Sequence, residues 1–541
     1  MTSRLRNCFR NPVFLLALAA SLLAVVVQSG ELGSADTMHR LQTAHSFWTS
    51  EPPVFLEEYP EFGLHGRGGK LYDWYGIGQP LLLLPSDVAG TYAEKLPIFA
   101  QYRESEPTVR NIVVTYSTSI LISVLTALVC FRLLRLFQFT TNQAIAGVLA
   151  LLFCTTHLHY TQNLMENNYI LLLTLTGFTF QYEWLRTGNK RALLAGSAAF
   201  GLNLLTRLTT GIDLLAGAFF LLLVWRWEGK GQRNIRREFA TYLRTALPVY
   251  VFFLLLDRAY QYYRFGTLFS TYMRFFAEEH QRVYPSLPAS YPFETPFRVG
   301  FLGPLITPEK SIFLFDPLLV LMVVLAVVVW KRFRPDLKAY VAAAFMMLLA
   351  YICFYAKYTD WSGDFAWGDR YVSTAAQLAA FVSVPVLLRY RLELGRALRT
   401  FGMTLIVVSV VIQLASLAFW MPLEIYQMET LGHPTFVIGL RLQNILAFAL
   451  GRMDQWGLNN QAMTQDAWDY VHITTWNFLP FVLRRVGEAP AWVVRLSFAV
   501  WGASVTFLGG VLWWTRRLAC TRAEESGGPP VAVAREPQNM A

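Results

Sequence analysis

Long apolar runs recur along almost the whole chain, and this pattern limits the folds open to it. A run of about 20 apolar residues can cross the hydrocarbon core of a bilayer as a helix. Hydrophobic residues make up 54% of the 541 residues, and they come in runs instead of alternating with polar residues. We therefore predict an all-α, polytopic membrane protein with about twelve transmembrane helices, at residues 12–28, 111–131, 142–158, 167–184, 191–206, 211–226, 241–257, 312–330, 339–356, 372–388, 401–421 and 493–515.

Basic residues lie mostly in the short loops that would share one side of the membrane. These loops include 185–191, 226–244 and 331–338, whereas the opposite loops carry few Arg and Lys residues. Basic loops stay in the cytoplasm, so we predict cytoplasmic N- and C-termini in a bacterial inner membrane. These loops also explain the net charge of +10, and we therefore predict no nucleic-acid partner.

The first 35 residues resemble a signal peptide. Arginines precede a short apolar core, and small residues follow it at Gly33 and Ala35. Because many further spans follow, we predict a retained first helix, and cleavage remains the alternative. The five cysteines have no metal-type spacing, so we expect neither a zinc site nor a disulfide framework.

Three long segments fall on the external side, and we expect function there. Residues 29–110 and 258–311 belong to a predicted catalytic module over 1–421, and residues 422–492 form a third external segment. They are rich in Trp, Tyr, Phe, Pro and Gly, which favours loops and short helices resting on the membrane. A last span at 493–515 and a disordered cytoplasmic tail at 516–541 complete the chain.

The segment 34–48 follows the first span directly and carries Asp36. In a helix, Asp36, His39, Arg40 and Thr43 share one face by their three-and-four spacing. A carboxylate so close to the bilayer is costly unless it is used. The alternative is an N-capped helix with an ordinary Asp36–Arg40 pair.

Two short external loops add further candidates. Glu166 heads the span that starts at 167, and Arg207 ends the span at 191–206. Glu166 could simply favour a helix N-terminus, and Arg207 could reach lipid headgroups. Alternatively, the planar guanidinium of Arg207 suits a phosphate. His157 and His159 lack a third ligand at a recognisable spacing.

The loop 358–371 is dense in acidic and aromatic residues and carries one arginine. Aromatic faces and carboxylates commonly hold sugars, although an interfacial aromatic belt would look similar. Arg264 and Lys310, in the second long segment, could help to hold an anion. The candidates in the loop are Asp360, Trp361, Asp364, Asp369 and Arg370.

Carboxylates and basic groups thus gather on one membrane face, which suits transfer of a group from a lipid phosphate. A carboxylate would take the proton of an acceptor hydroxyl, and Arg and Lys would stabilise the departing phosphate. Such a reaction needs no cofactor.

The topology, with an acidic residue just after the first span, resembles the GT-C glycosyltransferases that use polyprenyl-phosphate-linked sugars. Over residues 10 to 390 the chain looks most like the bacterial relatives of protein O-mannosyltransferases and of the lipid A aminoarabinose transferase. The resemblance rests on Asp36, Glu166, the 71–81 segment with Tyr75, "Leu-Thr-Arg" ending at Arg207, "Arg-Phe-Gly-Thr" at 264–267, "Thr-Pro-Glu-Lys-Ser-Ile-Phe" at 307–313 and "Trp-Gly-Asp-Arg-Tyr" at 367–371.

Three departures from the family pattern stand out. Asp36-Thr37 replaces two acidic residues, Asp369 stands where proline is commoner, and Glu166-Asn167-Asn168 lacks the paired acids of metal-dependent oligosaccharyltransferases. We therefore do not predict a required metal, although a divalent ion stays an unsupported alternative.

The resemblance implies an inverting glycosyltransferase with an external or periplasmic active site. Asp36 would be the general base, and Glu166 would assist it or orient the acceptor, which could be a lipid, a glycan or a protein. Donor phosphate would meet Arg207, Arg370 and Lys310, and substrate would meet His39, Tyr75, Asp360, Trp361, Asp364, Asp369 and Arg264. The alternatives are a lipid-linked glycan ligase or polymerase, and a twelve-helix transporter.

Overall fold

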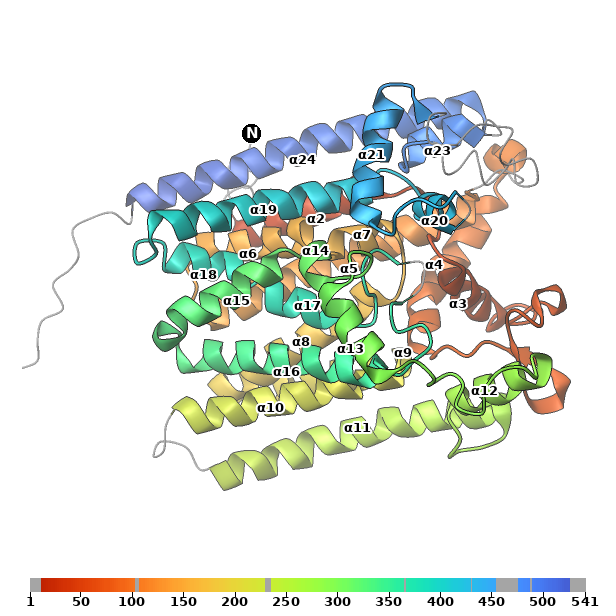
Figure 1. Cartoon of the computed structure of the whole chain (residues 1–541), viewed down its shortest axis with the longest axis horizontal. Coiled ribbons are helices and arrows are strands. Elements are labelled where there is room, and N and C mark those ends of the chain that lie inside the picture. Colours follow the sequence, from red (N-terminus) through yellow and green to blue (C-terminus); the bar gives the residue numbers. More distant parts are fainter. Residues whose placement is uncertain are drawn as a thin grey trace, which may run out of the picture.

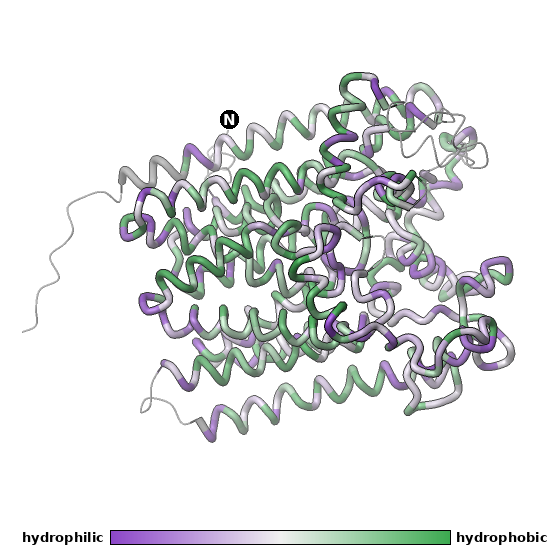
Figure 2. Tube along the Cα trace, in the orientation of Figure 1, coloured by the Kyte–Doolittle hydropathy of each residue, from purple (hydrophilic) through white to green (hydrophobic). Residues whose placement is uncertain are grey.

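A computed structural model describes residues 11–102, 107–228, 235–363, 366–429, 431–453, 475–486 and 489–525. The protein is a bundle of roughly aligned helices whose longest connections collect at one end (Figure 1). Apolar residues follow the helices, and polar residues gather at both ends of the bundle (Figure 2). This is the hydropathy pattern of a multi-pass membrane protein.

Each predicted span coincides with a helix or a pair of helices, so the all-α, multi-pass prediction is confirmed. Among the described residues, six helices are long and apolar enough to cross a membrane: α5, α10 with the turn before it, α11, α16, α19 and α24. The bundle helices are α2 (Pro12–Val27), α5 (Val109–Leu136), α6 (Thr141–Cys154), α8 (Asn167–Thr187), α9 (Lys190–Thr206), α10 (Gly211–Glu228), α11 (Ile235–Phe265), α15 (Leu318–Val329), α16 (Pro335–Tyr355), α17 (Ser373–Ala380), α18 (Ser383–Arg389), α19 (Arg396–Ser416) and α24 (Ala491–Glu525).

Three predicted spans are interrupted in the structure, and the one at 142–158 is divided between α6 and α7 (His157–Gln162). The span at 312–330 is split into α14 (Ile312–Phe315) and α15, because Pro317 cannot continue a hydrogen-bonded helix. The Asp316 carboxylate at this break accepts a 2.7 Å hydrogen bond from the Thr156 amide. The span at 372–388 is likewise divided between α17 and α18.

Shorter elements form the loop-rich end of the bundle. Two short strands, β1 (Leu64–His65) and β2 (Leu71–Tyr72), pair antiparallel, with Leu64 opposite Tyr72. The helices here are α3 (Ala35–Ser46), α4 (Gly78–Glu94), α7 (His157–Gln162), α12 (Tyr272–Val283), α13 (Phe297–Ile306), α20 (Pro422–Glu429), α21 (Val437–Ala449) and α23 (Leu479–Val486).

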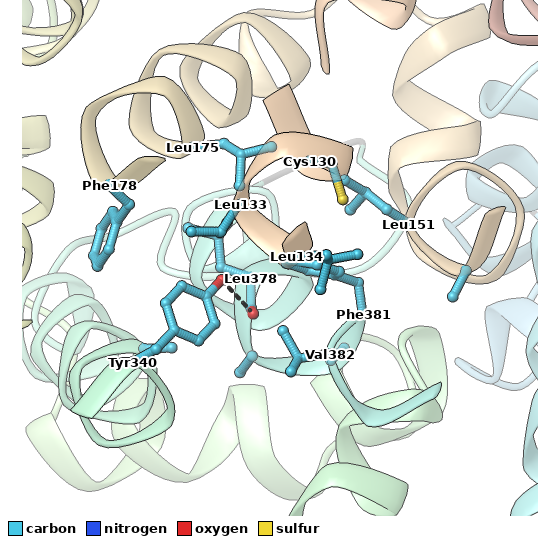
Figure 3. Packing of buried hydrophobic residues seen from close by; sticks show 14 of the residues in the cluster. Cys130, Leu133, Leu134, Leu151, Leu175, Phe178, Tyr340, Leu378, Phe381 and Val382 are labelled. Carbon is cyan, nitrogen blue, oxygen red and sulfur yellow. Dashed lines mark hydrogen bonds between the residues drawn. The ribbon is translucent and has the colours of Figure 1, made fainter. Parts of the chain in front are cut away.

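The main hydrophobic core lies between the bundle helices. Leu133 and Leu134 of α5 pack with Phe178 of α8 and with Tyr340 of α16 (Figure 3). The Tyr340 hydroxyl donates to the Leu378 carbonyl at 2.9 Å, so this polar group is satisfied inside the core. The packed core fixes the ends of α8, α9 and α16, and these ends carry the candidate site.

Candidate functional site

The start of helix α3 is fixed by a serine N-cap and by one hydrogen bond to a distant segment of the chain. The Ser34 hydroxyl accepts from the Thr37 amide at 3.3 Å, which places Asp36 in the first helical turn. The Thr37 hydroxyl donates to the Leu164 carbonyl at 2.9 Å. Because Leu164 lies two residues before Glu166, this bond brings the two predicted carboxylates to the same place.

The Asp36 carboxylate has three cationic or polar partners. One oxygen accepts from the Tyr75 hydroxyl at 2.6 Å, and the other accepts from Arg370 Nη1 at 2.5 Å. Arg40 Nη2 lies 3.9 Å from the second oxygen. Burial alone would raise the pKa of Asp36, but Arg370, Arg40 and the Tyr75 hydroxyl outweigh burial and hold this pKa well below its usual range. Asp36 is therefore a carboxylate.

Glu166 is held between two arginines. Arg40 Nη2 lies 2.6 Å from one carboxylate oxygen, and Arg207 donates to the other. Arg40 is 2% exposed, and its guanidinium stacks 3.8 Å above the Tyr75 ring. Arg40 thus links Asp36 and Glu166 into one network.

A cavity of about 450 Å³ opens over this network at the loop-rich end of the bundle. Its volume lies in the range of small-molecule sites. The charged residues that line it are Asp36, Arg40, Glu166, Arg207, Asp257, Arg258, Arg264, Asp360 and Arg370. The cavity is therefore a charged site with arginines in slight excess over carboxylates.

Aromatic rings form another part of the cavity wall. Tyr355 and Tyr371 stack with their centroids 4.3 Å apart. The guanidinium groups of Arg207 and Arg370 lie 5.1 and 5.3 Å from the Tyr371 centroid. Trp74, Tyr272 and Phe276 also line the cavity. Such faces suit a sugar ring beside an anion.

Several cavity residues carry buried polar atoms without a hydrogen-bond partner among the described residues. These atoms are Arg40 Nη1, Gln261 Nε2, Arg264 Nε and Arg370 Nε, and all four are N–H donors. A buried donor without a partner is costly, so such donors mark a place for an acceptor. Four such donors thus belong to residues that line the cavity.

The structure brings seven of the predicted site residues to the cavity: Asp36, Tyr75, Glu166, Arg207, Arg264, Asp360 and Arg370. Arg264 is nevertheless committed elsewhere, because its Nη1 donates to the Asp73 carboxylate at 2.8 Å and to the Tyr75 carbonyl at 2.9 Å. It braces the segment that carries Tyr75.

Four of the predicted residues that the structure describes lie outside the cavity lining, and the first three are Lys310, Asp369 and Trp361. The Lys310 ammonium donates to the Ala366 carbonyl at 3.0 Å, and it thereby supports the loop that carries Arg370. Buried Asp369 accepts from the Tyr371 amide at 2.9 Å. Trp361 packs over Gly303 of α13. Asp364, a further predicted residue, lies outside the described residues.

His39 is the fourth residue outside the cavity lining. Its ring stacks on Phe62 with centroids 3.4 Å apart. Burial lowers the pKa of His39 to about 4, so the ring is neutral near pH 7. Its position supports a packing role for this side chain.

Known structures provide a comparison for this geometry. The fold is similar to that of the Archaeoglobus fulgidus oligosaccharyltransferase in its apo form, with a TM-score of 0.45 and 12% identity over 77% of this chain and 58% of that one. It is also similar to ArnT from Cupriavidus metallidurans bound to undecaprenyl phosphate, with a TM-score of 0.39 and 13% identity over 95% of this chain and 78% of that one.

No protein-family model and no curated relative matches the sequence. The chain spans little more than half the length of the oligosaccharyltransferase.

Three residues on α11 that line the cavity were not predicted from the sequence, namely Asp257, Arg258 and Gln261. Asp257, Arg258, Gln261 and Arg264 line the cavity from the last two turns of this helix. Their i, i+4, i+7 spacing was the available signal, since Asp257, Gln261 and Arg264 fall on one helical face. The predicted span ended at residue 257, which placed Arg258 and Gln261 in a loop.

The described residues contain no group of three or more His, Cys, Asp or Glu side chains placed to hold a metal ion. The independence from metal stays a prediction.

Proposed function

We propose that this protein is an inverting glycosyltransferase that moves a sugar from a polyprenyl-phosphate donor to an acceptor hydroxyl. The observation that carries the proposal is a single cavity in which Asp36 and Glu166 meet Arg40, Arg207 and Arg370. Unpaired N–H donors of the cavity residues suit phosphate oxygens, and the aromatic wall suits a sugar. The resemblance of the sequence to GT-C enzymes supports the same reaction.

In the proposed reaction, the acceptor oxygen attacks the anomeric carbon of the donor sugar. The bond between that carbon and the phosphate oxygen breaks, and the polyprenyl phosphate leaves with the bonding electrons. The acceptor hydroxyl loses its proton to Asp36, which is the proposed general base. Arg370 and Arg207 stabilise the negative charge that grows on the phosphate.

The cavity occupies the end of the bundle where we place the external membrane face. There the polyprenyl chain can stay in the bilayer while its phosphate enters the cavity. The proposed location is a bacterial inner membrane, with both termini in the cytoplasm and the active site outside.

The second candidate is a ligase or polymerase that acts on lipid-linked glycans. It would use the same carboxylates and arginines, and it differs in the size of the donor. Part of the cavity wall is exposed at Asp360, which leaves room for a longer glycan.

The experiment is transfer of radiolabelled sugar from a panel of synthetic polyprenyl-phosphate donors to membrane extract. We expect transfer by the wild-type protein and a loss of about 100-fold to 10,000-fold in Asp36→Asn, the range that positioned acid–base groups supply. Donors with one sugar and with several sugars separate the two candidates. If the folded wild-type protein transfers sugar from none of the donors, the proposal is wrong.

A further inference from the structure

In this structure each oxygen of the Asp36 carboxylate already accepts one hydrogen bond. Tyr75 donates to one oxygen at 2.6 Å, and Arg370 donates to the other at 2.5 Å. A general base must offer a lone pair within hydrogen-bond reach of the acceptor proton, and a nearby cation makes it a weaker base. With Arg370 bound to it, Asp36 is a weaker base than it would be without this cation.

Of the three arginines, Arg370 is the one whose ion-pair partner in this network is Asp36 alone. Arg40 is 2% exposed, contacts both carboxylates and stacks on Tyr75. Arg207 is paired with Glu166. Arg370 has a side chain that is 13% exposed, and Asp36 is its one ion-pair partner among the described residues.

Arg370 also carries an unused donor. Its Nε is buried without a hydrogen-bond partner in the described part of the chain. A guanidinium that rotates toward the cavity can offer Nε and one terminal nitrogen together, which is the bidentate geometry that phosphate oxygens accept.

The local charge favours such a rotation when an anion arrives. Three guanidinium groups, from Arg40, Arg207 and Arg370, face only the two carboxylates of Asp36 and Glu166 in this network. The phosphodiester of a polyprenyl-phosphate sugar carries one negative charge and supplies the missing counterion. Arg370 can then pair with either Asp36 or the phosphate. Only the phosphate would also accept a hydrogen bond from Arg370 Nε.

Asp36 would keep its position after losing Arg370. The Tyr75 hydroxyl remains on the other oxygen, and Arg40 remains 3.9 Å away. One carboxylate oxygen then has no guanidinium within hydrogen-bond distance, which is closer to the geometry that a general base needs.

We propose that Arg370 transfers from Asp36 to the donor phosphate when the donor enters, so that the base becomes available only in the loaded site. This inference rests on the proposed function. The exchange makes Arg370 a residue that couples donor binding to activation of the acceptor. In the empty site, Arg370 stays on Asp36 and keeps it from accepting a proton unproductively. The charged and titratable groups around Asp36 are His39 and Arg40 of α3, together with Tyr75, Glu166, Arg207 and Arg370.

The direct test is a pair of cryo-electron microscopy structures of the full chain in nanodiscs. One sample contains undecaprenyl phosphate, and the other contains the uncharged alcohol undecaprenol. We expect Arg370 to contact the phosphate and to lie beyond hydrogen-bond distance of Asp36 only in the first sample. A bound phosphate with an intact Arg370–Asp36 pair would overturn the exchange and leave the proposed function standing. Absence of the phosphate from the cavity would overturn both.

A kinetic test uses two matched variants, Arg370→Gln and Arg207→Gln. Each removes one proposed phosphate contact, but only Arg370 touches Asp36. In the wild-type protein, the acid limb of the pH profile of kcat reports the loaded enzyme. It should lie about one pH unit or more above the acid limb of the pH profile of kcat/KM. Arg370→Gln should bring the two limbs together, whereas Arg207→Gln should keep them apart.

Arg370→Lys is a second variant, used in case Arg370→Gln does not fold. It keeps the positive charge and should keep the two acid limbs separate. Equal limbs in the wild-type protein, or limbs that stay separate in a folded Arg370→Gln protein, would contradict the exchange.

Discussion

Arg370 and Asp36 lie 334 positions apart in the chain, and their side chains meet at 2.5 Å. This contact joins the loop before α17 to the first turn of α3. It places a guanidinium group, which is well suited to bind phosphate, directly on the proposed base. The contact also explains why Asp36 stays ionised although most of its side chain is covered, since Arg370 and Arg40 offset the cost of desolvating the charge.

The Tyr75 hydroxyl should matter for catalysis more than for folding. Tyr75→Phe removes the 2.6 Å hydrogen bond to Asp36 and keeps the ring under Arg40. A hydrogen bond to a charged group contributes about 1.5–3 kcal/mol, so we expect kcat to fall by roughly 10-fold to 100-fold. Steady-state transfer kinetics measure the fall, and an unchanged unfolding temperature shows that the fold is intact. A variant with wild-type kcat would exclude a positioning role for Tyr75.

Arg207 should contribute to donor binding. Arg207→Gln removes a guanidinium that touches Glu166 and lies over Tyr371. The loss of one charge-assisted contact to phosphate predicts a KM for the donor that is higher by roughly 10-fold or more. The matched control is Arg282→Gln, since Arg282 pairs with Glu279 on the exposed surface of α12. Equal KM changes in both variants would contradict this prediction.

The Arg264–Asp73 pair should be a stability element. Both side chains are buried, and Asp73→Ala would leave the Arg264 charge with fewer acceptors. Removing one partner of a buried ion pair costs about 3–5 kcal/mol of the free energy of unfolding. Denaturation in detergent measures this cost. The exposed Arg274–Glu278 pair is the control, and Glu278→Ala should cost less than about 0.5 kcal/mol.

Gly76 should tolerate no side chain. A Cβ atom there would lie 2.2 Å from the Leu205 carbonyl oxygen, so Gly76→Ala must push the Tyr75 segment away from the end of α9. We expect a lower unfolding temperature and a loss of transfer activity. Gly211→Ala is the matched control, because its nearest neighbour would be the Leu204 side chain at 3.8 Å. If Gly76→Ala behaves like Gly211→Ala, the contact between these segments is not tight.

Asp369 should make stability depend on pH. Burial raises the pKa of Asp369 to about 7, while the value for an unfolded chain is about 3.9. Between these values the folded protein holds a proton that the unfolded chain has released, so the free energy of unfolding falls as pH rises from about 4 to about 7. Unfolding temperatures at pH 5 and pH 8 test this, and Asp369→Asn should show a smaller difference. The same difference in both proteins would contradict the prediction.

The helical bundle could be predicted from local sequence alone. Apolar runs set the spans, and the three-and-four spacing after Ser34 set the polar face of α3. Asp36, Glu166, Arg207 and Arg370 stood out as well, because charged groups beside a bilayer are costly without a use. Each of these signals lies within a few turns of helix, so no distant residue is needed to read it.

The partners of these charges were decided by the tertiary structure. Arg370 hydrogen-bonds to Asp36, Arg264 hydrogen-bonds to Asp73, and Lys310 donates to the Ala366 carbonyl. Gln261 entered the cavity because α11 continues past its apolar run to Phe265. A sequence records which residues carry charge, whereas the packing of helix ends decides which charges come within a few ångströms, and Coulomb energy in a buried site depends on that distance.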